Sequence, residues 1–90
     1  MESIVTAVAK YYGVDPALLR RHGLAGGDAK AAAVELACIL SGWTQRKIGQ
    51  YFGGISTSAV CKIRTRIRLA AKNDALKRAI AEIRSIEFKV

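Results

Sequence analysis

The residues whose types and spacing could do chemistry lie between positions 44 and 68, in the segment TQRKIGQYFGGISTSAVCKIRTRIR. Hydroxyl side chains at the start of a helix can hydrogen bond to base edges, and basic side chains further along can neutralise phosphates. The segment offers both in that order, and the chemistry it favours is the binding of a polyanion. The hydroxyl residues are Ser56, Thr57 and Ser58, and the basic residues one and two turns further on are Lys62 and Arg66.

No part of the sequence indicates catalytic chemistry. His22 is the only histidine, and Cys38 and Cys61 lack the CxxC spacing of a metal or redox site. No carboxylate pair, nucleophile–base pair or phosphate-binding Walker A loop can be assembled from the sequence. We therefore expect no enzyme, no cofactor, no metal and no small-molecule substrate, and we expect two reduced thiols rather than a disulfide.

The charge balance is the second indication of a polyanionic partner. Fifteen Lys and Arg residues stand against seven acids, which gives a net charge of +8 and a pI near 10.0. Residues 62–72 hold five of the basic residues and no acid. A small basic domain most often binds nucleic acid, and the alternative is a solvated basic surface without a partner.

Length and composition set the fold class. Ninety residues make a single domain, and the apolar fraction of 51% contains much alanine, which favours helices. With Pro16 as the only proline and no alternating β-branched runs, we expect an all-α fold over residues 1–90. No apolar run approaches a membrane span, and no secretory signal peptide is expected, so we expect a cytoplasmic, nucleoid-associated protein.

Capping residues and glycines predict about six helices. A helix over residues 2–12 ends at Gly13, a short one starts at Asp15-Pro16, and a third runs from Asp28, as its N-cap, to about Ser41. We expect the third helix to bury one face, formed by Ala33, Val34, Ala37, Cys38 and Leu40, with Leu36 near the edge. The remaining helices are expected at 44–52, capped by Thr44; at about 56–72, capped by Ser56; and from Ala75 to about Glu87.

The fourth and fifth helices together have the pattern of a helix-turn-helix. Gly49 provides the small residue that a closely crossing second helix requires, and Gly53-Gly54 provides a turn that tolerates positive φ. The alternative is an ordinary pair of packed helices. Apolar residues suited to the core between the two helices are Ile48, Phe52, Val60 and Ile63.

These residues also resemble a known family. AVAKYYGVDPALL, ELACILSGWTQRKIGQYFGG and the Val60, Lys62–Arg64 pattern are together similar to the C-terminal DNA-binding domain of the bacterial replication initiator DnaA, over about two-thirds of the chain. The resemblance implies a Trp-repressor-like helix-turn-helix fold. It also implies that the fifth helix enters the major groove and that the loop before the third helix lies near the minor groove.

The sequence departs from DnaA where DnaA reads bases. Ser56, Thr57, Ser58 and Ala59 replace an Asp-His-Thr-Thr run, so the DnaA target sequence is not expected. The loop before the third helix is rich in glycine rather than arginine. The GISTSAV wording is more similar to the DnaA-like domain of transposases associated with repetitive extragenic palindromes (REP-associated transposases), whose upstream nuclease motif this chain lacks.

The candidate DNA-binding residues fall into three groups. The hydroxyls of the fifth helix are expected to contact bases, and its cations to follow the groove or its phosphates. Arg46 and Lys47, early in the fourth helix, are expected to meet the DNA backbone. Arg21 and Lys30, the third group, lie around the loop before the third helix. Arg64 and Arg68 are not in these groups, because they are expected to point away from the DNA.

The sequence leaves three functions open. The first is a sequence-specific binding domain for double-stranded DNA, and the second is the DNA-targeting domain of a transposase or nuclease whose catalytic domain lies outside this chain. The third is a helical module that binds protein or RNA. The last helix is expected to pack on the first, and the alternative is that it forms a homodimer contact.

Overall fold

Helices make up most of residues 2–20, 27–71 and 74–88, which are the residues that the computed structural model describes. No strand occurs in these ranges, which confirms the all-α prediction. The helices are α1 (Glu2–Tyr12), α2 (Pro16–Leu19), α3 (Gly27–Leu40), α4 (Gln45–Tyr51), α5 (Thr57–Leu69) and α6 (Ala75–Ile83), and a π-helical segment, η1 (Arg84–Phe88), continues α6.

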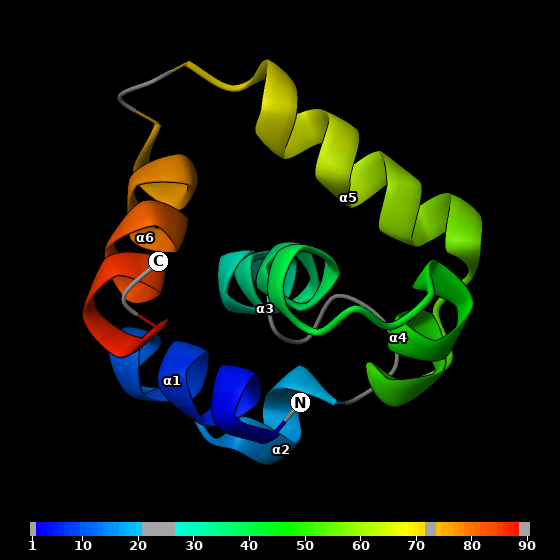
Figure 1. The fold of residues 1–90 in the computed structure, drawn as a ribbon, viewed down its shortest axis with the longest axis horizontal. Helices are drawn as coiled ribbons and strands as arrows, with labels where there is room; N and C mark the ends of the chain where they lie inside the picture. The colour runs from blue at the N-terminus through cyan, green and yellow to red at the C-terminus, as the bar shows by residue number, and fades with distance from the viewer. Residues whose placement is uncertain (1, 21–26, 72–73, 89–90) are drawn as a thin grey trace.

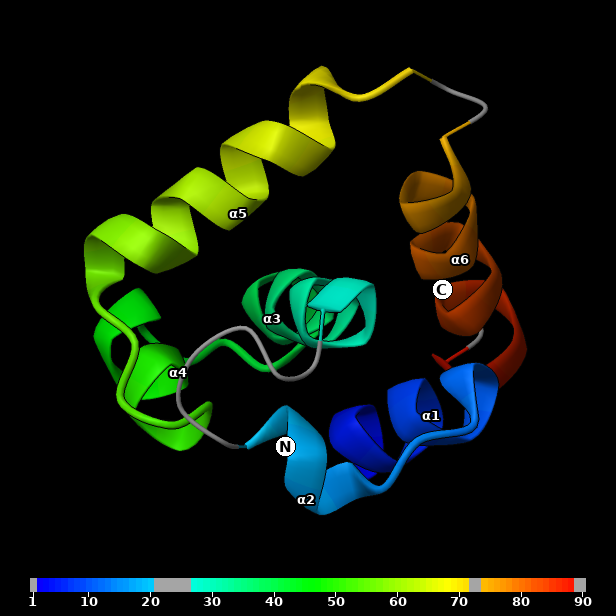
Figure 2. The same ribbon diagram turned by 180° about the vertical axis from the view of Figure 1, so that it is seen from behind.

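Helix α3 lies at the centre of the molecule, and the other helices surround it (Figures 1 and 2). Every residue from Ala29 to Ala37 is buried, so the prediction of a single buried face is wrong. Leu36, expected near the edge, is fully buried because α6 packs on α3 from one direction while α1, α4 and α5 pack from others. Cys38 and Leu40, at the C-terminal end of the helix, are half-buried and pack against the core.

Polar residues cap α2, α4 and α5 at the expected places, and Asp74 caps α6 in the same way. The side chains of Asp15, Thr44, Ser56 and Asp74 each accept a hydrogen bond from a backbone N–H in the first turn that follows. The exception is Asp28, because α3 already begins at Gly27. Asp28 therefore lies in the first helical turn rather than at the N-cap, where its carboxylate still complements the helix dipole.

The C-terminal helix packs inside the domain, against both α3 and α1. Its apolar residues Leu76, Ala79, Ile80 and Ile83 are buried, whereas Ile86 in η1 is 62% exposed. The Tyr11 hydroxyl of α1 donates a hydrogen bond to the Glu82 carboxylate of α6, which raises the pKa of Tyr11. The contact with the first helix is thus confirmed, and α3 is an additional partner.

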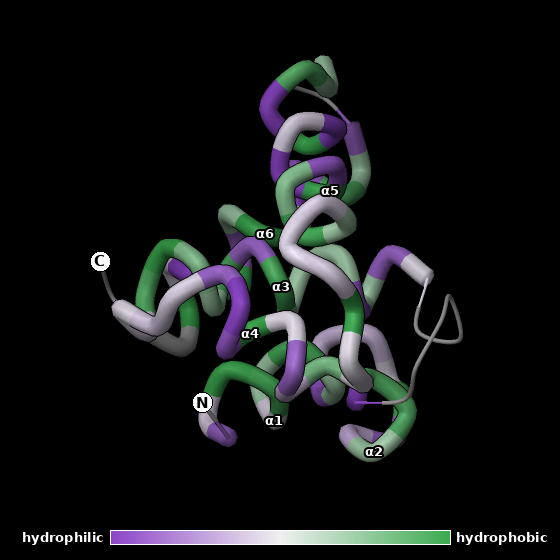
Figure 3. The backbone as a smooth tube through the Cα atoms, turned by 90° about the vertical axis from the view of Figure 1, so that its right-hand side faces the viewer, coloured by the Kyte–Doolittle hydropathy of each residue, from purple (hydrophilic) through white to green (hydrophobic). Residues whose placement is uncertain are grey.

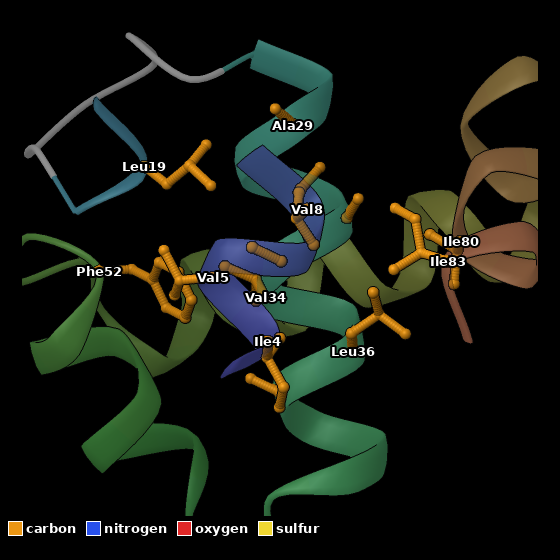
Figure 4. Packing of buried hydrophobic residues seen from close by; sticks show 14 of the residues in the cluster. Ile4, Val5, Val8, Leu19, Ala29, Val34, Leu36, Phe52, Ile80 and Ile83 are labelled. Carbon is orange, nitrogen blue, oxygen red and sulfur yellow. The ribbon is translucent and has the colours of Figure 1, made fainter. Parts of the chain in front are cut away.

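The core is a layer of aliphatic side chains around α3. Val8, Val34 and Leu36, from α1 and α3, meet Phe52 and the isoleucines of α6 there (Figure 4). Helix α5 covers this core at the edge of the molecule, and hydrophilic residues alternate with hydrophobic ones along it (Figure 3). This placement leaves one side of α5 on the core and the other toward solvent. The helix ends at Leu69, before the expected residue 72, because Ala70 adopts extended backbone.

Candidate nucleic-acid interface

A tight glycine turn joins α4 to α5. Gly53 and Gly54 have φ values of 91° and 80°, as the sequence predicted for a turn that tolerates positive φ. The backbone N–H groups of Gly54 and Ile55 both donate to the carbonyl oxygen of Gly49 at 3.0 Å. The turn is therefore fastened to the last turn of α4, and it fixes where α5 begins.

Gly49 is the point of closest approach within this unit. A Cβ atom added there would collide with the backbone carbonyl oxygen of Ile55. The sequence predicted a small residue because the second helix would cross nearby. The structure also requires a small residue at position 49, but the backbone that approaches Gly49 belongs to the turn before α5 and not to α5 itself.

Helix α5 is held on the domain by an apolar stripe and by an ion pair with a buried carboxylate. Val60 and Ile67 are buried and Ile63 is half-buried, facing the fully buried Ile48 and Phe52. These positions match the predicted core between the helices. They fix the rotation of α5 and so determine which side chains point outward.

The ion pair joins α5 to the central helix. Arg64 Nε donates to Glu35 Oε1 at 2.8 Å, and Glu35 is only 8% exposed. This hydrogen bond raises the pKa of Arg64, so the guanidinium stays charged. Arg64 thus points toward α3 and away from the exposed hydroxyls of α5, as expected. Arg68, for which the same was expected, is exposed.

The outward side of α5 carries the predicted polar and basic residues. The Ser56 hydroxyl accepts a hydrogen bond from Ala59 N–H at 3.1 Å, and its own proton remains available to a ligand. Helix α5 itself contains no acidic residue. The exposed candidates on this side are Ser56, Thr57, Ser58, Lys62 and Arg66.

A groove of about 710 Å³ runs between α5 and the N-terminal part of α3. Lys62 and Arg66 line it from α5, and Lys30 lines it from α3. Lys30 is only 4% exposed, and its burial lowers its pKa. The structure thus places Lys30 near the start of α3, after the loop, as a largely buried residue in the wall of this groove.

Asp28 is a residue of this groove that the sequence did not single out as part of the site. Its carboxylate accepts a hydrogen bond from Arg66 Nη2 at 3.3 Å, and both side chains are largely exposed. The two residues are 38 positions apart, so no local pattern indicates the pair. Any anion that binds Arg66 competes with Asp28.

The candidates outside α5 are placed less uniformly. Arg46 and Lys47 are exposed in the first turn of α4, as expected for contacts with the DNA backbone. Lys47 Nζ lies 4.3 Å from the centroid of the Trp43 ring, a cation–π contact that partly occupies the ammonium. Arg21 lies outside the described residues.

The described residues give no sign of a metal site or a membrane span. Within residues 2–20, 27–71 and 74–88, no cluster of three or more His, Cys, Asp or Glu side chains is present, and no helix has the length and apolarity to cross a membrane. Both cysteines are free in this part of the chain, Cys38 half-buried and Cys61 exposed.

Comparison with known proteins gave no significant match to a family model, a curated protein or a solved structure. The candidate interface is therefore described by its geometry alone: a capped helix with one hydroxyl-rich and basic side, which begins at a glycine turn.

The close approach at Gly49 leads to a stability prediction. Gly49→Ala is expected to lower the free energy of unfolding by about 1–3 kcal/mol, although alanine is otherwise the better helix former by roughly 1 kcal/mol. Thermal unfolding followed by circular dichroism measures the change. Gln50→Ala, at the exposed neighbouring position of α4, is the control and should leave the midpoint unchanged or slightly higher. An equal midpoint for the two variants would contradict the close contact.

The Glu35–Arg64 pair leads to a second stability prediction. Arg64→Met is expected to lower the free energy of unfolding by about 1–2 kcal/mol, because it leaves a buried carboxylate without its charged donor. Arg68→Met removes the same charge from the next turn of α5 and should change stability by less than about 0.5 kcal/mol. Urea denaturation of both variants tests this, and equal losses would show that Glu35 does not depend on Arg64.

Proposed function

We propose that this chain is a domain that binds double-stranded DNA, with α5 as the recognition helix in the major groove. The observation that carries the proposal is the outward side of α5, which is hydroxyl-rich at its start, basic along its length and free of acids. The net charge of +8 supports a polyanionic partner for the domain as a whole.

The dimensions of α5 suit this role. Thirteen residues give a helix of about 20 Å, and the major groove of B-DNA is about 12 Å wide, enough to admit an α-helix. Helix α5 lies at the edge of the molecule, where its outward side is not covered by another helix (Figure 1). The N-terminal residues of a recognition helix are those that contact base edges. Ser56, Thr57 and Ser58 occupy those positions.

The cations around α5 supply the affinity. Lys62 and Arg66, on α5, are assigned to the phosphates that border the major groove, and Arg46 and Lys47, at the start of α4, to the DNA backbone. Contacts to phosphates position a protein on the duplex without reading its sequence. The hydroxyls therefore carry what base preference the domain has, and hydroxyls discriminate bases weakly.

The resemblance to the C-terminal domain of DnaA supports the same reading of α4 and α5. The similarity of the GISTSAV sequence to REP-associated transposases suggests a second function, in which this domain targets a catalytic domain to DNA. Both functions use the same surface in the same way. A parent sequence with a nuclease motif upstream would favour the transposase function.

The proposal is tested by the salt dependence of binding. Fluorescence anisotropy with a labelled random duplex should give a negative slope of log K against log salt, with about −0.9 for each phosphate neutralised. Lys62→Gln should make the slope less steep by about 0.9 and weaken binding roughly five- to tenfold at 0.1 M salt. Lys10→Gln, an exposed cation of α1, is the control and should match the wild type. Absence of binding at low salt would refute the proposal.

Base contact is tested separately at Thr57. Thr57→Ala should leave binding to random duplex nearly unchanged and should reduce the preference for a target selected from a random pool, because a hydroxyl contact to a base edge is lost. The measurement is the ratio of dissociation constants for the selected and random duplexes. An unchanged ratio would remove Thr57 from the base-reading surface.

The Asp28–Arg66 pair predicts a substitution that strengthens binding. Asp28→Asn releases Arg66 from its carboxylate partner, so affinity for duplex DNA should rise roughly two- to fivefold at low salt, the range of an exposed charge pair. The gain should shrink as salt rises. Glu2→Gln removes the same charge from the exposed start of α1 and controls for net charge. A similar gain in both variants would show that Arg66 has no special role.

A further inference from the structure

A second groove lies along α5, and none of the DNA contacts proposed above uses it. Its volume is about 510 Å³, and α5, α6 and the C-terminal half of α3 form its walls. Its α5 residues include Cys61, Thr65 and Arg68. At 100° per residue, these lie on roughly the opposite side of α5 from Ala59 and Ile63, which line the first groove, beside the N-terminal part of α3. The outward side of α5 thus runs between two grooves.

Basic residues line the second groove from two directions. Arg64 and Arg68 stand one turn apart on α5. Lys77 of α6 and Arg84, the first residue of η1, line the groove from the other side. Glu35 is the one acid among the residues that line it, and its charge is already paired with Arg64 at 2.8 Å. Three cations, from Arg68, Lys77 and Arg84, therefore remain to face an anion.

These cations have hydrogen-bonding capacity that the described part of the domain does not use. Lys77 Nζ donates one hydrogen bond, to the Ala70 carbonyl at 3.2 Å, and has two further protons. Arg84 Nε is buried and has no acceptor among the described residues. Buried donors usually have an acceptor, so this one stands out. Arg84 is also one of the residues that line the groove.

We propose that this second groove binds a backbone phosphate of the DNA strand that borders α5 on the α6 side. The assignment rests on the proposed function of α5. A helix in the major groove has a sugar–phosphate strand on each side, and Lys62 and Arg66 can serve only one of them. Arg68, Lys77 and Arg84 serve the other. Helix α6, which does not enter the major groove, thereby becomes part of the DNA interface.

The sequence did not reveal this role for α6. Lys77 lies in α6, which has a strongly apolar face, and Arg84 follows directly in η1; in the sequence both have the pattern of ordinary solvated charges. Only the packing of α6 beside α3 brings them to the same groove as Arg68.

The test compares two adjacent cations of α6. Lys77 lines the groove, whereas Arg78 lies on another side of the helix, near Glu82. In anisotropy titrations with duplex DNA at several salt concentrations, Lys77→Gln should make the slope of log K against log salt less steep by about 0.9 and raise the dissociation constant roughly five- to tenfold at 0.1 M salt. Arg78→Gln should leave the slope unchanged.

A second variant keeps the test valid if Lys77→Gln destabilises the fold by losing its bond to Ala70. Arg68 is exposed, so Arg68→Gln should fold normally by circular dichroism and give the same change in slope as Lys77→Gln. If the wild type binds duplex DNA and the slopes of Arg68→Gln and Arg78→Gln agree with it, the groove is not a phosphate site and the function of α5 still stands. If the wild type does not bind, the proposed function fails together with the site.

A titration with inorganic phosphate separates the backbone from a free anion. Amide chemical shifts around residues 64–68 and 77–84 should move little below tens of millimolar phosphate, because one phosphate lacks the rest of the DNA interface. Saturation of those shifts at low millimolar phosphate, together with an unchanged salt slope in Arg68→Gln, would identify a site for a free anion and overturn the assignment to the DNA backbone.

Discussion

The burial of α3 on all sides is the constraint on which the rest of the structure depends. The helix spans much of a molecule of 28 × 26 × 24 Å, and the other helices pack directly on it. Alanine at positions 29, 31, 32, 33 and 37 makes this possible, because small side chains let neighbouring helices approach from several directions at once. The core of this small domain is therefore built around close helix contacts more than around large side chains, of which Phe52 is the largest that is fully buried.

The presentation of α5 follows from that arrangement. Val60 and Ile67 seat one side of the helix on the core, Glu35 of the buried α3 holds Arg64, and the turn fastened to Gly49 sets where the helix begins. With those three attachments made, the hydroxyls and the remaining cations of α5 can only point outward or into the grooves beside it. For the proposed contact with a rigid duplex, a surface organised in this way does not need to rearrange, so little affinity would be lost to ordering.

Local signals in the sequence predicted most of the fold, but contacts between residues far apart in the chain were not predictable. Capping by Thr44 and Ser56 and the positive φ of Gly53 and Gly54 depend on neighbouring residues, so they were readable. The full burial of Leu36 was not, because it depends on helices that arrive from other parts of the chain. The same limit applies to the candidate site: the hydroxyls and cations of α5 form a local pattern, whereas Asp28 and Lys77 join the surface only through packing.

The most direct test of the account is a map of the DNA contacts on the domain. Amide chemical-shift changes of the isotopically labelled protein, followed during titration with a short random duplex, should concentrate in residues 44–68, with further changes near residues 77–84, and should leave α1 unaffected. That result would establish α5 and its two flanking grooves as the interface. Changes concentrated on α1 and α2, or no changes at low salt, would contradict the central claim that the outward side of α5 binds DNA.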